Sequence, residues 1–302
     1  MQADGVFVRP IVMRFPLLLL GVCLVSRAAA ADSGPLWERF SGKKALEQVQ
    51  ALVDLGPRPA GSEALEKSRT YIEKQLQSAG WKTSRQSFSA QTPRGLVTFI
   101  NLIARFGDRA APDFLLCSHY DTKTFDTVKF VGANDGGSST GLLLELGRVL
   151  SQDPARARRV ELVFFDGEEA FENFTDSDGL YGSRFFARDL TDKKFKGGIL
   201  FDMIGDSSLD VTLPPDSPRP LARGIFDAAE KLKVRDHFTY FSGQILDDHT
   251  PLNAAGIPTI DLIDFDFAWW HTAGDTMDKI SAESLQIVGQ VALRYLAEEA
   301  LK

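Results

Sequence analysis

The residues of this chain best suited to chemistry are its four histidines and several carboxylates, which could together bind a metal ion. Two of the histidines lie in motifs that could bind a metal. His119 is followed by Tyr120-Asp121, and His271 lies between Trp270 and Thr272. Three acidic residues could join them: Asp135, Glu169 and Asp202. Two imidazoles with three carboxylates suit zinc, which catalytic sites hold through three protein ligands and an open position. Two such ions can share one bridging carboxylate. The sequence has no HExxH motif, so a thermolysin-like arrangement is excluded.

A second carboxylate, Glu168, directly precedes Glu169. Neighbouring residues in an extended or turning segment point in different directions, so one can bind a metal while the other faces a substrate. A carboxylate beside a metal but not bound to it is well placed to transfer a proton. Two solvated surface acids are the alternative. We favour the functional interpretation because the pair follows the apolar run 160–165, and strands of α/β sheets end at the ligand crevice.

Two further motifs allow more than one interpretation. Asp121 either orients the imidazole of His119 or is a turn aspartate. The segment 137–141 fits G-x-S-x-G, which would make Ser139 a nucleophile. That motif requires a strand directly before it, whereas Gly132-Ala133-Asn134-Asp135 reads as a loop. A serine hydrolase is therefore disfavoured.

The elements that must position these residues alternate between helices and strands. Helical spacing of apolar residues, with stops at glycine, predicts helices over 43–55 and 62–79, and further helices over 141–150 and 284–301. Apolar runs predict strands over 99–104, 114–118, 160–165, 198–201 and 259–263. This order indicates a single α/β domain with a central mixed, mostly parallel sheet flanked by helices on both faces. The candidate site residues follow the strands, at the edge where ligands bind.

Composition and the N-terminus limit the possible partners and compartment. The 302 residues carry a net charge of −7, which argues against nucleic-acid binding. Arg14, the apolar run 15–25 and Ala28-Ala29-Ala30-Ala31 indicate a signal peptide over 1–31. A membrane anchor is the alternative, but the run is too short to span a bilayer. We expect a catalytic domain over 32–302, exported to the periplasm or secreted, without membrane attachment after cleavage and monomeric.

The chain resembles the zinc aminopeptidase family that also contains the animal-type glutaminyl cyclases. The motifs that carry this resemblance are Ser118-His119-Tyr120-Asp121, Gly132-Ala133-Asn134-Asp135, Gly167-Glu168-Glu169 and Trp270-His271-Thr272. Within the family, four blocks are specifically similar to the cyclases: 164–171, 180–184, 200–205 and 247–251. The resemblance implies a zinc-dependent cyclotransferase that converts N-terminal glutamine of peptides or proteins into pyroglutamate and releases ammonia. The alternatives are a di-zinc aminopeptidase and, less favoured, a non-catalytic binding domain on the same scaffold.

The resemblance also implies a role for each site residue. A single zinc would be bound by three residues: Asp135, Glu169 and His271. Glu168 would transfer the proton, while Asp202 and Asp247 would hold the surrounding hydrogen-bond network. The substrate pocket would be walled by Trp270 and Phe174. Independently of the resemblance, Phe265, Phe267 and Trp269 could also shape this pocket, and core packing is the alternative for the phenylalanines. In the peptidase branch a second zinc would instead use His119 and Asp202, with Asp135 bridging.

Three positions depart from the family pattern. Gly136 stands where the animal cyclases carry a serine, and Asp261 stands where they carry a histidine. A disulfide of the animal enzymes would join the positions of Ser118 and Thr140, so this chain lacks it. We expect these changes to alter the network around the site and to leave the metal ligands intact.

Overall fold

The computed structural model describes residues 1–6, 8, 34–108, 110–190 and 195–302. The chain divides into two units, Met1–Ser33 and Gly34–Lys302, and the helices and strands of the described residues belong to the second. The apolar run and cleavage site of the predicted signal peptide lie outside the described residues. Within the part of the chain that is described, no helix is long and apolar enough to cross a membrane.

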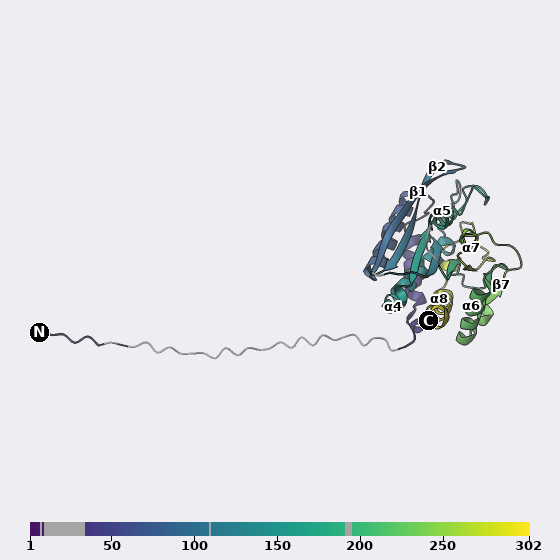
Figure 1. Ribbon diagram of the computed structural model, residues 1–302. Coiled ribbons are helices and arrows are strands. Elements are labelled where there is room, and N and C mark those ends of the chain that lie inside the picture. The colour runs from purple at the N-terminus through teal and green to yellow at the C-terminus, as the bar shows by residue number, and fades with distance from the viewer. Residues whose placement is uncertain (7, 9–33, 109, 191–194) are drawn as a thin grey trace. The chain divides into compact units, whose positions relative to one another are not determined.

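A single eight-stranded sheet forms the centre of the second unit, with the strand order β1-β2-β4-β3-β5-β8-β6-β7. Figure 1 shows β1 and β2 side by side and β7 on the opposite side of this unit. β4, β3, β5 and β8 are parallel neighbours, whereas β2 is antiparallel to both β1 and β4, and β6 is antiparallel to β8. The predicted mixed, mostly parallel sheet is therefore confirmed. The strands are β1 (Trp81–Thr92), β2 (Gly95–Phe106), β3 (Phe114–His119), β4 (Val160–Phe165), β5 (Gly197–Asp202), β6 (Val211–Leu213), β7 (Phe238–Tyr240) and β8 (Thr259–Ile263).

Helices cover both faces of this sheet, as the unbroken apolar strands predict. Alternate residues of β3 point to opposite faces, so Leu116 belongs to one hydrophobic cluster and Leu115 to another. The larger cluster packs against α1 (Gly42–Val53), α2 (Glu63–Ser78), α3 (Ser139–Leu150), α6 (Arg219–Leu232) and α8 (Ala282–Tyr295). The smaller one packs against α5 (Tyr181–Asp189) and α7 (His249–Ala254). Short elements complete the fold: η1 (Leu36–Arg39), α4 (Pro154–Ala157), η3 (Arg235–His237), η4 (Met277–Lys279) and the π-helical η5 (Leu296–Ala300).

Serine side chains set the starts of three helices. The hydroxyls of Ser41, Ser62 and Ser281 accept hydrogen bonds from backbone N–H groups in the first turns of α1, α2 and α8. Such caps satisfy amides that the helix itself cannot pair. The three helices begin within two residues of the starts that the sequence predicts.

The parallel strands bring the candidate site residues to one edge of the sheet. His119 is the last residue of β3 and lies level with Phe165, the last residue of β4. Asp202 is the last residue of β5. Glu168 and Glu169 follow β4 by a short turn. The carboxyl ends of the central strands therefore form the site, as in other open α/β sheets.

Candidate metal centre and active site

Three residues from distant segments converge at this edge: Asp135, Glu169 and His271. One potential ligand atom from each lies within 4.8 Å of the others. Nε2 of His271 is 3.4 Å from Oδ2 of Asp135 and 3.2 Å from Oε2 of Glu169. Both carboxylates are buried, and 18% of the His271 side chain is exposed. The group therefore faces a small opening rather than a closed core.

The polar atoms of this group fit a metal ion. Oδ2 of Asp135 and both carboxylate oxygens of Glu169 are buried without a hydrogen-bond partner among the described residues. Buried unpaired carboxylates are costly unless they are neutralised or bind a metal. Burial, and then the charge of Asp135, raise the pKa of Glu169. Two carboxylates and one imidazole are a donor set that zinc accepts, with a fourth position left open.

The loop that carries His271 is held in an unusual conformation. His271 has a left-handed φ of 54°, which is uncommon outside glycine. Its ring stacks on Trp270 at 4.2 Å and meets the edges of Phe125 and Phe130 at 5.9 and 5.8 Å between centroids. This aromatic packing fixes the direction in which Nε2 points.

The turn that carries Asp135 is tied to the same loop. Asp135 lies in a kinked turn, Asn134–Ser138, directly before α3. The carboxylate of Asp275 accepts hydrogen bonds from the backbone N–H groups of Asn134 (2.7 Å) and Asp135 (3.1 Å). Asp275, which the sequence did not single out, therefore links the segments of two candidate ligands.

Asp121 orders the segment of the paired glutamates. Its two carboxylate oxygens accept the backbone N–H groups of Glu168 and Glu169, each at 3.3 Å. Its Oδ1 also lies 3.5 Å from Nδ1 of His119, an ion-pair distance without hydrogen-bond geometry. Glu168 is buried, and burial together with the charges of Asp247 and Glu169 raises its pKa well above the usual range.

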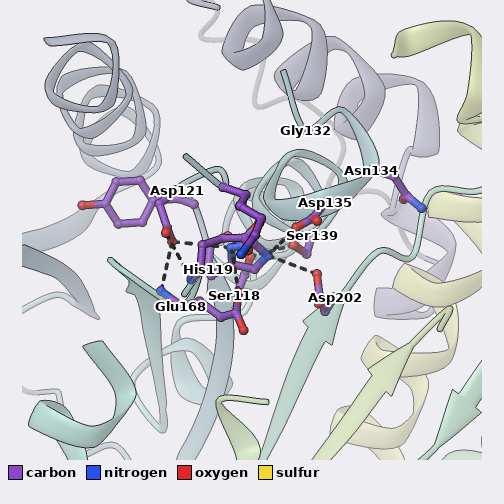
Figure 2. A network of polar contacts seen from close by, with 12 residues as sticks. Ser118, His119, Asp121, Gly132, Asn134, Asp135, Ser139, Glu168 and Asp202 are labelled. Carbon is purple, nitrogen blue, oxygen red and sulfur yellow. Dashed lines mark hydrogen bonds and ion pairs between the residues drawn. The ribbon is translucent and has the colours of Figure 1, made fainter. Parts of the chain in front are cut away.

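His119 lies at the centre of a second group with Asp135 and Asp202 (Figure 2). Its Nε2 is 3.2 Å from Oδ1 of Asp135 and 3.2 Å from Oδ1 of Asp202, and the latter contact has hydrogen-bond geometry. All three residues are buried. Asp135 thus belongs to both groups, which is the arrangement that a bridging ligand requires.

A third group combines Asp247, His249 and Asp261. Nδ1 of His249 is 3.3 Å from Oδ2 of Asp261, and all three side chains are buried. Burial raises the pKa of Asp261 well above the usual range, so the carboxyl group that replaces a histidine favours its neutral form. Asp247 also reaches the cavity described next.

A cavity of about 180 Å³ opens onto the candidate ligands. Its polar lining is Asp135, Glu168, Glu169, Asp202, Asp247 and His271, and its apolar lining is Phe174, Met203, Ile245, Leu246, Ile263, Phe265 and Trp270. Phe174, Trp270 and Phe265 thus lie where a pocket wall was expected. Phe267 and Trp269 do not line it, and for Phe267 the core-packing alternative is the one that the structure shows. Phe267 packs in a core cluster with Met203 and Ile263, and Trp269 lies against Gly274 and below Lys279.

The positions that depart from the family pattern have physical explanations. Gly136 has φ +73°, and a Cβ there would lie 2.5 Å from the carbonyl oxygen of Asp121, so the backbone leaves no room for a serine. The hydroxyls of Ser118 and Thr140 are 3.4 Å apart, where a disulfide would otherwise join them. Ser118 also donates to Ser139, which is fully buried at the start of α3 and is therefore no exposed nucleophile.

Lys123 is a further residue at the site that sequence reasoning missed. Its Nζ donates to the carbonyl of Ala170 at 2.7 Å, lies 3.7 Å from Oε2 of Glu169 and sits 5.6 Å from the ring centre of Phe174. It thus joins a candidate ligand to a pocket wall. No motif around it gave a signal, because its role arises only from contacts between loops.

Comparisons with known proteins show which family and which solved structures this chain is similar to. The model of peptidase family M28 matches residues 101–296. The glutaminyl-peptide cyclotransferase-like protein of Bos taurus is 31% identical over 276 residues, covering 80% of this chain and 72% of that protein. The crystal structure of an Acidobacteriales bacterium glutaminyl cyclase has a TM-score of 0.79 and 34% identity, covering 91% of this chain and 99% of its own. A leucine aminopeptidase precursor from Bacteroides thetaiotaomicron also has a TM-score of 0.79, at 26% identity and covering 86% of this chain and 98% of its own.

Proposed function

The chain belongs to peptidase family M28, and we propose that it is a zinc-dependent glutaminyl-peptide cyclotransferase acting on peptides or proteins with N-terminal glutamine. The similarity to cyclases over most of the chain supports this activity. The observation that carries the proposal is the convergence of Asp135, Glu169 and His271, with orphaned oxygens, beside Glu168 in a small cavity. An aminopeptidase would use the same edge of the sheet, and it is the alternative that the experiment must exclude.

The proposed reaction forms a ring from the substrate's own groups. The α-amine nitrogen attacks the side-chain amide carbon, a C–N bond forms, and the bond to the amide nitrogen breaks. A zinc ion held by Asp135, Glu169 and His271 would supply Lewis-acid polarisation of that carbonyl. Holding amine and amide together in a confined cavity removes much of the entropic barrier.

Glu168 is the group that would move the proton. Its carboxylate takes a proton from the attacking α-amine and returns it to the departing amide nitrogen, which leaves as ammonia. Burial raises the pKa of Glu168 from the acidic range of a free carboxyl group, and an acid–base group works best when its pKa lies near the working pH, so that it can both accept and return a proton. Asp202 and Asp247, which line the same cavity, would hold the surrounding polar network, and Phe174 and Trp270 would wall the substrate side chain.

Three measurements on the same purified protein can distinguish a glutaminyl-peptide cyclotransferase from an aminopeptidase. The purified protein is incubated with a peptide beginning in Gln and with one beginning in Leu, while ammonia, free amino acids and bound zinc are measured. We expect ammonia from the Gln peptide, no free amino acid, and one zinc per chain. Release of the N-terminal amino acid with two zinc ions per chain would refute the proposal and favour an aminopeptidase.

The remaining proposals concern the state of the protein in the cell. We propose that residues 1–31 direct export and that the mature chain is a monomer. N-terminal sequencing of the exported protein tests the first, with cleavage after Ala31 expected. Light scattering of the purified mature chain tests the second.

A further inference from the structure

A second and larger cavity lies beside the catalytic one. It is a groove of about 550 Å³ formed by residues of β1, α5 and α7 and by the loop before α5, a volume within the roughly 300–1,000 Å³ that ligand pockets usually have. Figure 1 shows α5 close to β1 and β2, and α5 also packs against α7. Neither Glu168 nor any candidate metal ligand lines this cavity, which we call the α5 groove. Its apolar lining includes Phe88, Ala90, Ala187, Pro251, Ala254 and Ala255.

The α5 groove shares two walls with the catalytic cavity. The loop that carries Phe174 into the catalytic cavity contributes Asp176 to the groove two residues later, and two residues of backbone span at most about 8 Å. Asp247 lines the catalytic cavity, and Pro251, four residues further on, lines the groove. A peptide whose N-terminal residue lies in the catalytic cavity can therefore reach the groove within a few residues.

Aromatic packing holds the α5 groove in shape. The ring of Phe88 stacks on Phe185 at 4.2 Å and on Phe99 at 5.4 Å between centroids. Tyr181, a further lining residue, stacks on Phe99 at 4.7 Å and donates its hydroxyl to the carboxylate of Asp178. These rings thus form a wall that exists before a ligand arrives.

Two guanidinium groups give the groove a positive wall. Arg184 and Arg188 lie one turn apart on α5, and both line the groove. Arg184 donates to the backbone carbonyls of Thr175 and Asp176, and Arg188 lies at the edge of an aromatic ring. Among the described residues, no carboxylate forms an ion pair with either guanidinium. The carboxylate of Asp176 is the one acidic group of the described lining, so the positive charges outnumber it.

The stability of α5 does not explain this positive wall. Like charges four residues apart destabilise a helix. Asp189, the acid at the end of α5, accepts instead from the amide of Gln86 on β1. The whole chain carries a net charge of −7, so its overall field repels anions. A preference for an acidic ligand would therefore have to come from the local wall of Arg184 and Arg188.

We propose that the α5 groove binds the part of a peptide or protein substrate that follows its first few residues, and that it selects segments in which acidic residues flank an apolar one. The inference rests on the proposed function. Arg188 offers its planar guanidinium to one carboxylate of such a segment, and the apolar side chain would cover Phe88 and remove apolar surface from water. A basic segment would instead face like charges.

The test compares two peptides that differ only in the charge of their later residues. The acidic peptide is Gln-Ala-Ala-Glu-Leu-Glu and the basic peptide is Gln-Ala-Ala-Lys-Leu-Lys, both amidated at the C-terminus. We expect kcat/KM for ammonia release to be roughly fivefold or more higher for the acidic peptide at low ionic strength. The difference should lie in KM, because the groove holds the peptide equally in the ground and transition states. It should shrink in about 0.5 M salt, which screens exposed charges.

Variants assign the preference to the groove. Arg188→Glu should remove or reverse the preference, whereas Arg188→Lys, which keeps the charge, should retain most of it. Arg158→Glu makes the same change of net charge at an exposed residue after α4, outside the groove lining, and should leave the preference unchanged. Equal kcat/KM for the two peptides, an unchanged preference in Arg188→Glu, or an equal loss in Arg158→Glu would overturn the inference.

A binding measurement separates this inference from the proposed function. Absence of ammonia from both peptides would overturn the proposed cyclotransferase. The groove is then judged by fluorescence anisotropy with the same two peptides carrying a C-terminal dye. Tighter binding of the acidic peptide that is lost in Arg188→Glu would support the groove, and equal affinities would overturn it.

Discussion

Replacing Asp275 should weaken metal binding without touching a candidate ligand. Its buried carboxylate lies on the loop of His271 and accepts two backbone N–H groups from the turn of Asp135. Asp275→Ala leaves both donors unpaired inside the protein. Each buried unsatisfied donor costs about 1–3 kcal/mol, so we expect the free energy of unfolding to fall by roughly 2–6 kcal/mol. Asp275→Asn retains one acceptor and should lose about half as much.

Zinc affinity is the more specific measurement. Groups that orient metal ligands without binding the metal themselves typically contribute about 10–100-fold to metal affinity. Asp275 fixes the backbone of the candidate ligand Asp135 in this way. We therefore expect Asp275→Asn to bind zinc at least tenfold more weakly in competition with a chelator. Asp278→Asn, an exposed acid on the next turn, is the matched control. Unchanged zinc affinity in a folded Asp275→Asn would refute the proposed link between the two loops.

The pH dependence of the metal-free protein gives an independent readout. Burial, and then the charge of Asp135, raise the pKa of Asp275 to about 7. A carboxyl group whose pKa is raised on folding binds more protons in the folded state, so its contribution to stability falls as pH rises from about 4 to 7. Urea unfolding across this range should show that decline in the wild type and a smaller one in Asp275→Asn.

Three further substitutions test other parts of the site. Glu168→Gln should retain bound zinc and lose ammonia release, because the metal ligands remain while the group that carries the proton is gone. Full ammonia release by this variant would remove Glu168 from the mechanism. Gly136→Ser should lower the free energy of unfolding by about 1–2 kcal/mol from its left-handed φ alone, and more through the clash with Asp121; unchanged thermal unfolding would contradict this. Asp178→Ala should raise KM, because its carboxylate accepts the N–H groups of residues 171–173 and so orders the segment of Phe174; an unchanged KM would show that this segment does not depend on Asp178.

The sequence predicts the core elements of the sheet well and its periphery poorly. The central strands are continuous apolar runs because they are buried on both faces, and such runs are visible in any window of the chain. β1 was missed because it is an edge strand with mainly polar residues, most of them partly or fully exposed. β6 and β7 are three residues long each, too short for periodicity to indicate them.

The same distinction separates the site residues that were predicted from those that were not. Asp135, Glu169 and His271 belong to motifs whose residue types already indicate metal chemistry. Asp275 and Lys123 act through contacts between loops that only the folded chain brings together. The sequence could not decide whether Phe267 and Trp269 line the pocket, because neighbouring residues on a turning loop face different surroundings.

The two metal groups that share Asp135 place different demands on His119. A second ion in the group of His119 would require a lone pair on Nε2, which would have to point at the metal. In the 3.2 Å contact between Nε2 and the carboxylate of Asp202, His119 donates a hydrogen bond only in a state that carries a proton on that nitrogen. Both cannot hold at once. The number of zinc ions bound per chain therefore distinguishes the two states: one ion leaves His119 as a hydrogen-bond partner of Asp202, and two ions make it a metal ligand.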